Sequence, residues 1–282
     1  MEALKFIRKE WKPFLVVTGL CLLILLIMLE FYPKQKRLNG LLVDLELDGP
    51  NPARYGELRD AVTRRLADEV PSLRQVKLNL TYVHFADLDQ DAVSSERVHF
   101  LILSPQRTPW HAYSGEYRSK LESLKRLIHE LILKKGMPVL GICGGHQFLA
   151  LAFGGDVEFI DPKFAESASE RYPRDALAER GVVQLQTLGD DPIFEGLVHH
   201  PGRFEASQSH YEEVKVVPKP FVNLARSEIS EAQLIRIPGR PVYGMAFHPE
   251  RGWDGKAGAV QNGGKQILAN FFRMVAKANQ GH

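Results

Sequence analysis

Two short segments of this 282-residue sequence combine residue types that could carry out nucleophilic catalysis. The first is Gly-Ile-Cys-Gly-Gly around Cys143, which follows the apolar run from Pro138 to Ile142. Glycines on both sides of a reactive residue are typical of a nucleophile elbow, a tight strand-to-helix turn without room for neighbouring side chains. A thiol in that turn points out of the sheet, and the following helix N-terminus stabilises its thiolate. Cys143 is therefore the candidate nucleophile, although a lone G-x-C-x-G pattern also fits a cysteine that only packs a strand against a helix.

The second segment is His248-Pro249-Glu250, which ends an apolar run that begins at Pro241. On an extended backbone the His-x-Glu spacing projects both side chains to the same side, so the carboxylate can orient the imidazole. The other imidazole nitrogen is then free to face a thiol. The sequence therefore predicts a triad of Cys143, His248 and Glu250.

Composition and charge exclude several other classes of protein. The net charge of +2 is small and the basic residues are scattered, which argues against a nucleic-acid partner. The two cysteines, Cys21 and Cys143, lie in such different contexts that we expect no disulfide between them. No Cys or His spacing is typical of a zinc site, and we predict neither a metal nor a cofactor.

The elements that must position these residues alternate between strands and helices. Apolar runs predict strands, and residues spaced at three and four predict helices. Before the elbow we expect strands over 40–47, 76–85, 98–103 and 138–142 and helices over 55–69 and 117–135; after it we expect strands over 181–187, 214–217, 232–237 and 242–247 and a helix over 264–276. This pattern predicts one α/β domain over residues 40–277, with a mostly parallel sheet flanked by helices and the site at the carboxyl ends of its strands.

Residues 14–32 form a separate apolar segment, with Glu30 as their only charge. At about 1.5 Å per residue this length just spans a hydrocarbon core of roughly 30 Å. We therefore predict a basic tail over 1–13, a transmembrane helix over 14–32 and a linker over 33–39. The alternatives are a signal peptide, which lacks a small-x-small cleavage site, and a buried core helix, which would not be apolar on every face. Basic residues flank both ends of the segment, so the positive-inside rule hardly distinguishes the two orientations of the helix in the membrane. An unpaired reactive thiol survives best in a reducing compartment, which favours a cytoplasmic domain.

The segments GICGGHQ and GMAFHPE resemble the G-x-C-x-G-x-Q and F-H-P-E signatures of class I glutamine amidotransferases. Two further segments, 191–197 and 209–214, are similar to the family's "IF-x-GL" and "SH-x-D-x-V" motifs, so the resemblance covers nearly all of residues 40–277. It implies a flavodoxin-like amidotransferase fold. It also implies a reaction in which Cys143 attacks a glutamine side-chain amide, His248 shuttles the proton, ammonia leaves and water resolves a thioester.

The resemblance also implies roles for residues around the triad. Gly144 is the expected first oxyanion donor. The second donor lies in a glycine-rich turn in the family, but here the segment is Leu-Ser-Pro-Gln-Arg-Thr over 103–108; Pro105 has no N–H, so Gln106 is the expected donor. Gln147 matches a glutamine-contacting position. The segment Ser209, His210 and Tyr211 matches the one that holds the amino-acid end of the substrate. Ala246 replaces the family's usual glutamine, which leaves the preference for free glutamine open.

Three functions follow from these features. The leading hypothesis is a glutaminase that delivers ammonia to a separate synthetase, because the sequence shows no synthetase domain of its own. The second is hydrolysis of a γ-glutamyl amide or peptide on the same triad. The third is a catalytically silent scaffold that binds a membrane partner, against which the complete triad argues.

Overall fold

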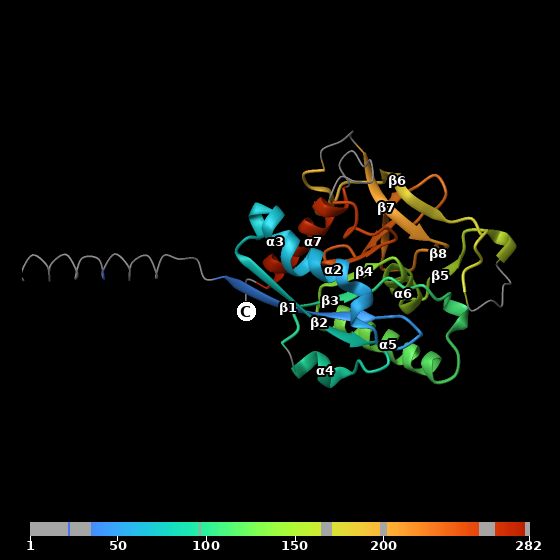
Figure 1. The fold of residues 1–282 in the computed structure, drawn as a ribbon, viewed down its shortest axis with the longest axis horizontal. Helices are drawn as coiled ribbons and strands as arrows, with labels where there is room; N and C mark the ends of the chain where they lie inside the picture. Colours follow the sequence, from blue (N-terminus) through green and yellow to red (C-terminus); the bar gives the residue numbers. More distant parts are fainter. Residues whose placement is uncertain are drawn as a thin grey trace, which may run out of the picture. The chain divides into compact units, whose positions relative to one another are not determined.

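A nine-stranded sheet organises the larger part of the chain (Figure 1). The structure is a computed structural model that describes residues 22, 35–95, 97–164, 171–197, 202–253 and 263–279. The chain divides into two units, Met1–Lys36 and Arg37–His282. In the first unit only Leu22, Gln35 and Lys36 are described, and Leu22 is helical.

The predicted tail, transmembrane helix and first linker residues therefore lie outside the described residues, apart from Leu22. Within the ranges that the structure does describe, no helix is both long enough and apolar enough to cross a membrane. The membrane segment over 14–32 stays a prediction.

The strand order of the large sheet is β2-β1-β3-β4-β11-β10-β9-β6-β7, and a separate pair is formed by β5 and β8. The strands are β1 (Lys36–Asp44), β2 (Val76–His84), β3 (Phe100–Leu103), β4 (Val139–Ile142), β5 (Asp156–Phe159), β6 (Glu179–Thr187), β7 (Arg203–His210), β8 (Glu212–Val216), β9 (Val222–Arg226), β10 (Leu234–Arg236) and β11 (Val242–Met245). The neighbours β1, β3, β4 and β11 pair in parallel. From β11 through β10, β9 and β6 to β7 the pairing is antiparallel. The predicted α/β class is confirmed, with a sheet that is mixed because its second half is antiparallel.

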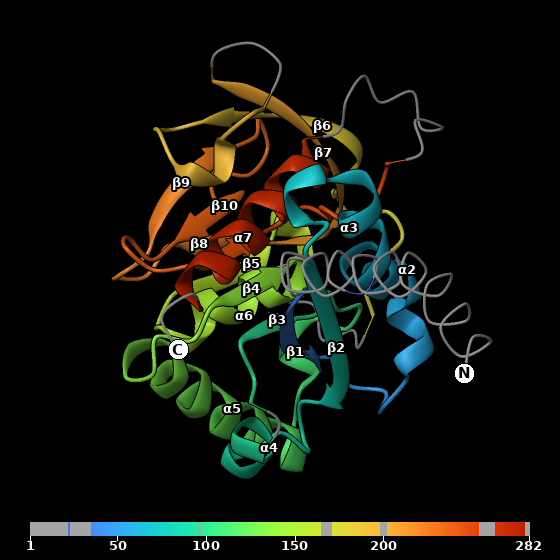
Figure 2. The ribbon, with the colours of Figure 1, turned by 90° about the vertical axis from the view of Figure 1, so that its left-hand side faces the viewer.

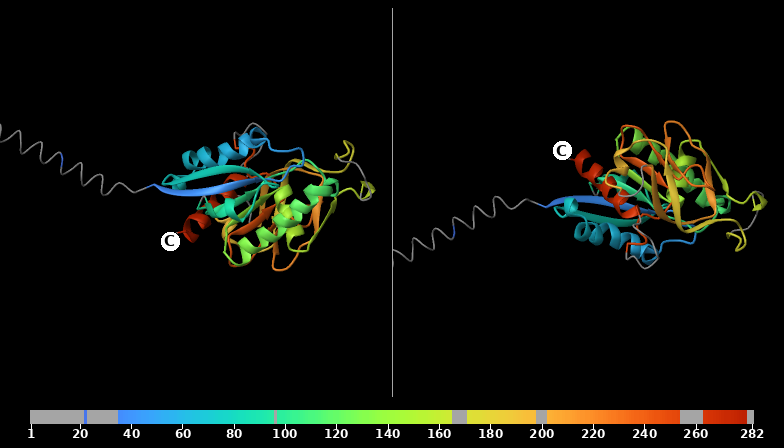
Figure 3. Two further views of the ribbon diagram at one scale, coloured as in Figure 1. Left: turned by 90° about the horizontal axis from the view of Figure 1, so that it is seen from below. Right: turned by 90° about the horizontal axis from the view of Figure 1, so that it is seen from above.

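Helices cover both faces of the parallel strands. They are α2 (Gly56–Asp60), α3 (Leu66–Glu69), α4 (Gln90–Ser95), α5 (Gly115–Leu133), α6 (Gly144–Ala152) and α7 (Gly264–Ala278); a π turn (Ala61–Arg65) joins α2 to α3, and short 3-10 turns lie at Pro52–Tyr55, Pro71–Leu73, Trp110–Ala112, Pro162–Phe164 and Pro192–Phe194. Figure 2 shows α7 and α3 on one side of the strands and α5 on the other, and Figure 3 views the domain along this direction, from below and from above.

Two apolar cores follow from this layering. Alternate residues of β1 point to opposite faces, so Leu42 joins the core beneath α7 while Leu41 and Val43 join the core beneath α5. The four residues of β3 and of β4 are all buried. Continuous apolar strands of this kind are expected where helices cover both faces of a parallel sheet.

Candidate active site

The predicted strand, turn and helix around Cys143 are all present. Cys143 lies between β4 and α6 and has a φ of +51°, which is rare for a residue with a side chain. A Cβ atom on Gly141 would lie 2.3 Å from the carbonyl oxygen of Gly145, and one on Gly145 would lie 2.2 Å from that of Leu103. Both positions therefore require glycine for the close approach of backbone to backbone, as a nucleophile elbow does.

The parallel pairing of β4 and β11 brings the two catalytic segments to one edge of the sheet. Met245 lies opposite Ile142, and the N–H of Cys143 donates to the carbonyl of Met245 at 2.7 Å. Beyond β11 the N–H of His248 donates to the carbonyl of Ser207 at 2.8 Å, which fixes the turn that carries the imidazole.

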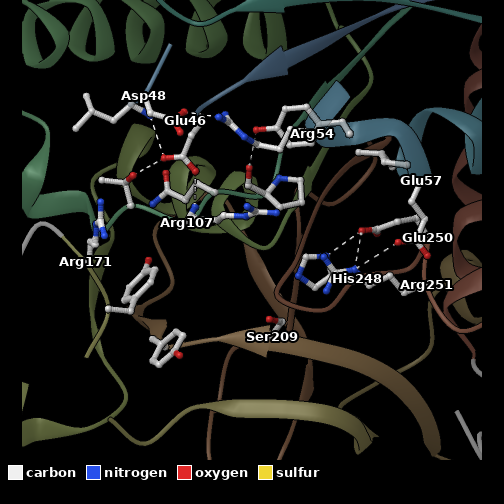
Figure 4. A pocket seen from close by; sticks show the side chains of 18 residues that line it. Glu46, Asp48, Arg54, Glu57, Arg107, Arg171, Ser209, His248, Glu250 and Arg251 are labelled. Atoms are coloured by element: carbon white, nitrogen blue, oxygen red, sulfur yellow. Dashed lines mark hydrogen bonds and ion pairs between the residues drawn. The ribbon is translucent and has the colours of Figure 1, made fainter. Parts of the chain in front are cut away.

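The three predicted triad residues lie together. Nδ1 of His248 is 2.9 Å from Oε1 of Glu250, and the imidazole lies close enough to Cys143 for the sulfur to raise the pKa of His248. His248 is 2 % exposed and Glu250 3 % exposed, so their interaction is shielded from water. Figure 4 shows both side chains at one end of the pocket.

The electrostatics of this group favour an ion pair. Burial lowers the pKa of His248, but the charge of Glu250 and the hydrogen bonds to Cys143 and Glu250 outweigh it and raise the pKa to about 9. Burial acts to raise the pKa of Glu250, but the charge of His248 outweighs it and holds that pKa below its ordinary value. His248 is therefore an imidazolium at neutral pH, and together with the N-terminus of α6 it stabilises negative charge on Sγ.

The two predicted oxyanion donors lie against each other beside the nucleophile. A Cβ atom on Gly144 would lie 2.9 Å from the backbone nitrogen of Gln106. The N–H of Gly144 belongs to the first turn of α6, where it has no partner within the helix. The N–H of Gln106 makes no hydrogen bond to any other described residue. Both donors are thus available to an oxygen atom next to Cys143.

The predicted substrate residues divide into two pairs. Ser209 and Tyr211 line the pocket, and the carbonyl oxygen of Ser209 lies 3.9 Å from Sγ of Cys143. Gln147 and His210 are buried behind the pocket wall. The Gln147 amide accepts from Nε1 of Trp110 at 2.8 Å and donates to the carbonyl of Glu212 at 2.8 Å.

His210 is buried and does not line the pocket. Its Nε2 lies 2.9 Å from a Glu179 carboxylate oxygen, and its Nδ1 lies 2.9 Å from the carbonyl of Glu212. The ring therefore holds the turn between β7 and β8 from behind, while Tyr211 on the same turn stacks on Tyr172 with ring centroids 4.6 Å apart.

A pocket of about 710 Å³ opens beside the triad (Figure 4). Its charged lining residues are Glu46, Asp48, Arg54, Glu57, Arg107, Arg171, Glu250 and Arg251. Apart from Glu250, the sequence does not predict these charged residues as part of the site, because they come from loops and from the start of α2, which only the fold brings together. The parts of the chain that the structure describes hold no group of three or more His, Cys, Asp or Glu residues placed to bind a metal.

Glu212 is a second feature that the sequence reasoning missed, although it lies in the motif-like segment over 209–214. Burial raises its pKa to about 7, against hydrogen bonds from the hydroxyl of Tyr172 and the N–H of Trp110, both of which lower it. The Tyr172 hydroxyl donates to its carboxylate at 2.7 Å. A half-protonated carboxyl group therefore lies behind the Tyr172 side of the pocket at neutral pH.

The fold and the site define an α/β protein in which a cysteine on a nucleophile elbow lies next to a His–Glu pair that follows the neighbouring strand β11. The family described as "Glutamine amidotransferase class-I" matches residues 58–274. The chain belongs to the class I glutamine amidotransferase family, and it is an enzyme of the glutamine amidotransferase type with a cysteine nucleophile.

Named relatives support this assignment. A GMP synthase subunit from Methanopyrus kandleri, named as glutamine-hydrolysing, is 34% identical over 163 residues, which are 58% of this chain and 73% of the relative. The protein of the same name from Methanosarcina barkeri is 32% identical over 151 residues, 54% of this chain and 67% of the relative.

Solved structures show the same fold. A putative GMP synthase subunit from Thermoplasma acidophilum has a TM-score of 0.59 at 23% identity and covers 86% of this chain and 96% of its own. A glutamine amidotransferase from Thermotoga maritima has a TM-score of 0.53 at 19% identity and covers 86% and 97%. At these identities the likeness concerns the fold alone.

Proposed function

We propose that this enzyme hydrolyses the side-chain amide of free glutamine through Cys143 and that the ammonia passes to a separate acceptor enzyme. The observation that carries the proposal is the placement of Cys143 next to the hydrogen-bonded pair of His248 and Glu250 and next to the N–H groups of Gly144 and Gln106.

In the first half of the reaction Sγ of Cys143 attacks the amide carbon, and the carbonyl oxygen becomes an oxyanion held by the N–H groups of Gly144 and Gln106. The imidazolium of His248 gives its proton to the amide nitrogen, the C–N bond breaks and ammonia leaves. The product on the enzyme is a γ-glutamyl thioester.

In the second half neutral His248 takes a proton from water, whose oxygen attacks the thioester carbon. The C–S bond then breaks, which releases glutamate and restores the thiolate and the imidazolium. Glu250 keeps the imidazole oriented and stabilises its charged form in both halves.

The proposal of a separate acceptor rests on the relatives. They are named as one subunit of a glutamine-hydrolysing GMP synthase, which supports an acceptor of the synthetase class for the ammonia made here.

A γ-glutamyl amide or peptide is the second candidate substrate, and the size of the pocket favours it. A volume of about 710 Å³ falls in the range of pockets that hold drug-sized ligands, and glutamine is much smaller than such a ligand. The replacement of the glycine-rich oxyanion turn by Pro105-Gln106 and the presence of Ala246 are further departures from glutamine-specific members of the family.

Residues 14–32 supply the proposed location. Their length and apolarity support a single membrane anchor, and the free thiol at Cys143 supports a cytoplasmic enzyme domain.

Glutamate release by the purified full chain tests the proposal, with glutamine in one series and a γ-glutamyl amide of a larger amine in the other; the leaving group is ammonia in the first and the larger amine in the second. We expect turnover of glutamine that disappears in Cys143→Ala. A higher kcat/KM for the larger amide would favour the second candidate, and no turnover of either would contradict both.

A further inference from the structure

The loop after β3 must present the Gln106 N–H without the glycines that the family uses there. Pro105 and Gln106 stand in their place. The N–H of Gln106 nevertheless lies against Gly144, where the oxyanion hole requires a donor. Side chains from other parts of the chain must therefore hold this backbone, and Glu46, just beyond the end of β1, is placed to do so.

Glu46 is a carboxylate with 2 % exposure, and three donors point at it. Its Oε2 accepts the N–H of Arg107 at 2.7 Å, and its Oε1 accepts the N–H of Leu47 at 3.0 Å. Oε1 also accepts from the hydroxyl of Thr108. Two of these donors, Arg107 and Thr108, directly follow Gln106, so the carboxylate fixes the peptide on the far side of the oxyanion donor (Figure 4).

The near side of Gln106 is held by hydroxyl groups. The Ser104 hydroxyl donates to the carbonyl of Pro105 at 2.8 Å and accepts the N–H of Leu45 at 2.9 Å. The side chain of Gln106 itself is hydrogen-bonded to the Tyr113 hydroxyl at 3.0 Å. With both sides fixed, the Gln106 peptide cannot rotate its N–H away from Gly144 without breaking these bonds.

We infer that Glu46 is a positioning residue for the oxyanion hole, which holds the Gln106 N–H in place by binding the two residues after it. The inference rests on the proposed function, because it concerns a donor used in that reaction. A carboxylate suits this position since all three partners donate; a side-chain amide would place an NH2 group against at least one of them.

The inference predicts which reactions depend on Glu46. Acylation of Cys143 by an ester or an amide passes through an oxyanion, so it needs the Gln106 N–H. Alkylation of the same thiol by iodoacetamide develops no oxyanion and does not need it. A Glu46 variant should therefore lose acylation while keeping alkylation.

The test measures, in the full chain, kcat and KM with glutamine, the rate of Cys143 acylation by p-nitrophenyl acetate and the rate of alkylation by iodoacetamide. For Glu46→Gln we expect kcat and the acylation rate to fall about 10- to 100-fold, which approaches the effect of losing one oxyanion donor. We expect KM and the alkylation rate to stay within about threefold of wild type. Thr108→Val removes one donor to Glu46 and keeps the branched shape, so we expect a smaller fall of about twofold to fivefold. This second variant decides the question if Glu46→Gln does not fold.

Asp191→Asn is the matched control. Asp191 is also a buried carboxylate that accepts a backbone N–H, that of Ile193 at 2.8 Å, but it belongs to a loop that does not line the pocket. We expect it to lower stability and to leave the ratio of acylation to alkylation unchanged.

The inference would be overturned if Glu46→Gln kept the wild-type ratio of acylation rate to alkylation rate. It would also be overturned if this ratio fell equally in Asp191→Asn. A wild-type chain that shows no turnover of glutamine would contradict the proposed function instead, and the ratio of acylation to alkylation would still decide the role of Glu46.

Discussion

Glu250, whose carboxylate lies 2.9 Å from Nδ1, makes the largest favourable contribution to the charge of His248, and Cys143 adds to it. Since the pKa of His248 is raised to about 9, the imidazolium that protonates the leaving amide is present at neutral pH and is lost as the pH rises through about 9. We therefore expect kcat/KM to fall on the alkaline side near pH 9.

Glu250→Gln removes the charge that raises this pKa, so its alkaline limb should move down by about one pH unit or more. The comparison of pH profiles for the two enzymes cancels the titration of the substrate's own amino group. An alkaline limb at the same pH in both would contradict the role given to Glu250.

A second single residue, Glu212, makes the free energy of unfolding depend on pH. Its pKa is about 7 in the folded chain and its ordinary value is 4.5, so between these values the folded state holds a proton that the unfolded state has lost. The folded state is therefore destabilised by this group as the pH rises from about 4.5 toward 7, by on the order of 3 kcal/mol once the pH is above both values.

Glu212→Gln mimics the protonated form, so we expect its unfolding free energy, relative to wild type, to rise between about pH 5 and about pH 8. Urea denaturation at both pH values measures this. The exposed Glu158→Gln on β5 is the control and should follow wild type at both. If the unfolding free energy of Glu212→Gln relative to wild type stayed constant or fell between these pH values, Glu212 would be ionised in the folded chain.

At the scale of elements, the join between β4 and α6 depends on two glycines with different neighbours. A methyl group on Gly145 would meet the Leu103 carbonyl oxygen at 2.2 Å, so Gly145→Ala should lower the unfolding free energy by about 1–3 kcal/mol or more. A methyl group on Gly144 would lie 2.5 Å from Cγ and 2.9 Å from N of Gln106, so Gly144→Ala should separate the two oxyanion donors and lower kcat by about 100-fold.

Gly189→Ala is the control, because a methyl group there would meet nothing within 4 Å. Denaturation curves and glutamine turnover for the three variants separate the two effects. Equal turnover in Gly144→Ala and Gly189→Ala would contradict the placement of the oxyanion hole.

The helices and central strands could be predicted because their apolar periodicity is strong. The stripe from Leu121 to Ile132 predicted a helix over 117–135, and the structure has α5 over Gly115–Leu133. The strand β7 could not be found this way, since its inward-facing positions include Gln208 and His210. These polar side chains are buried because they bond to Gln233 and Glu179, and such partners cannot be read from local sequence.

The site residues also differ in how far local sequence predicts them. Cys143, His248 and Glu250 each follow a strand whose local sequence marks them, and the structure brings the three together. Glu46 and Tyr172 carry no local signal, because their partners lie far along the chain, at Arg107 and Glu212.

At the scale of the whole molecule, residues 14–32 determine where the ammonia would be made. If they form a membrane anchor, the full chain should sediment with membranes and resist alkaline carbonate, whereas a variant that lacks 14–32 should not. A full chain that washes off with carbonate would contradict the anchor.

A membrane-impermeant thiol reagent then tests the side of the membrane, with Cys143→Ala as the control. Labelling of Cys143 only after the membrane is opened supports a cytoplasmic enzyme domain that can supply a synthetase. Labelling in intact cells would overturn that placement and favour a γ-glutamyl hydrolase outside the cytoplasm.

The central claim is that Cys143 forms a covalent γ-glutamyl thioester, and acid quenching of the full chain during glutamine turnover tests it most directly. Peptide mapping by mass spectrometry should find a glutamyl group on Cys143 and none on Cys21, and the group should be removed by hydroxylamine, which cleaves thioesters. In His248→Ala the adduct should be absent or greatly reduced. Sustained turnover of glutamine with Cys143 unmodified at every quench time, or undiminished turnover in Cys143→Ala, would contradict this claim.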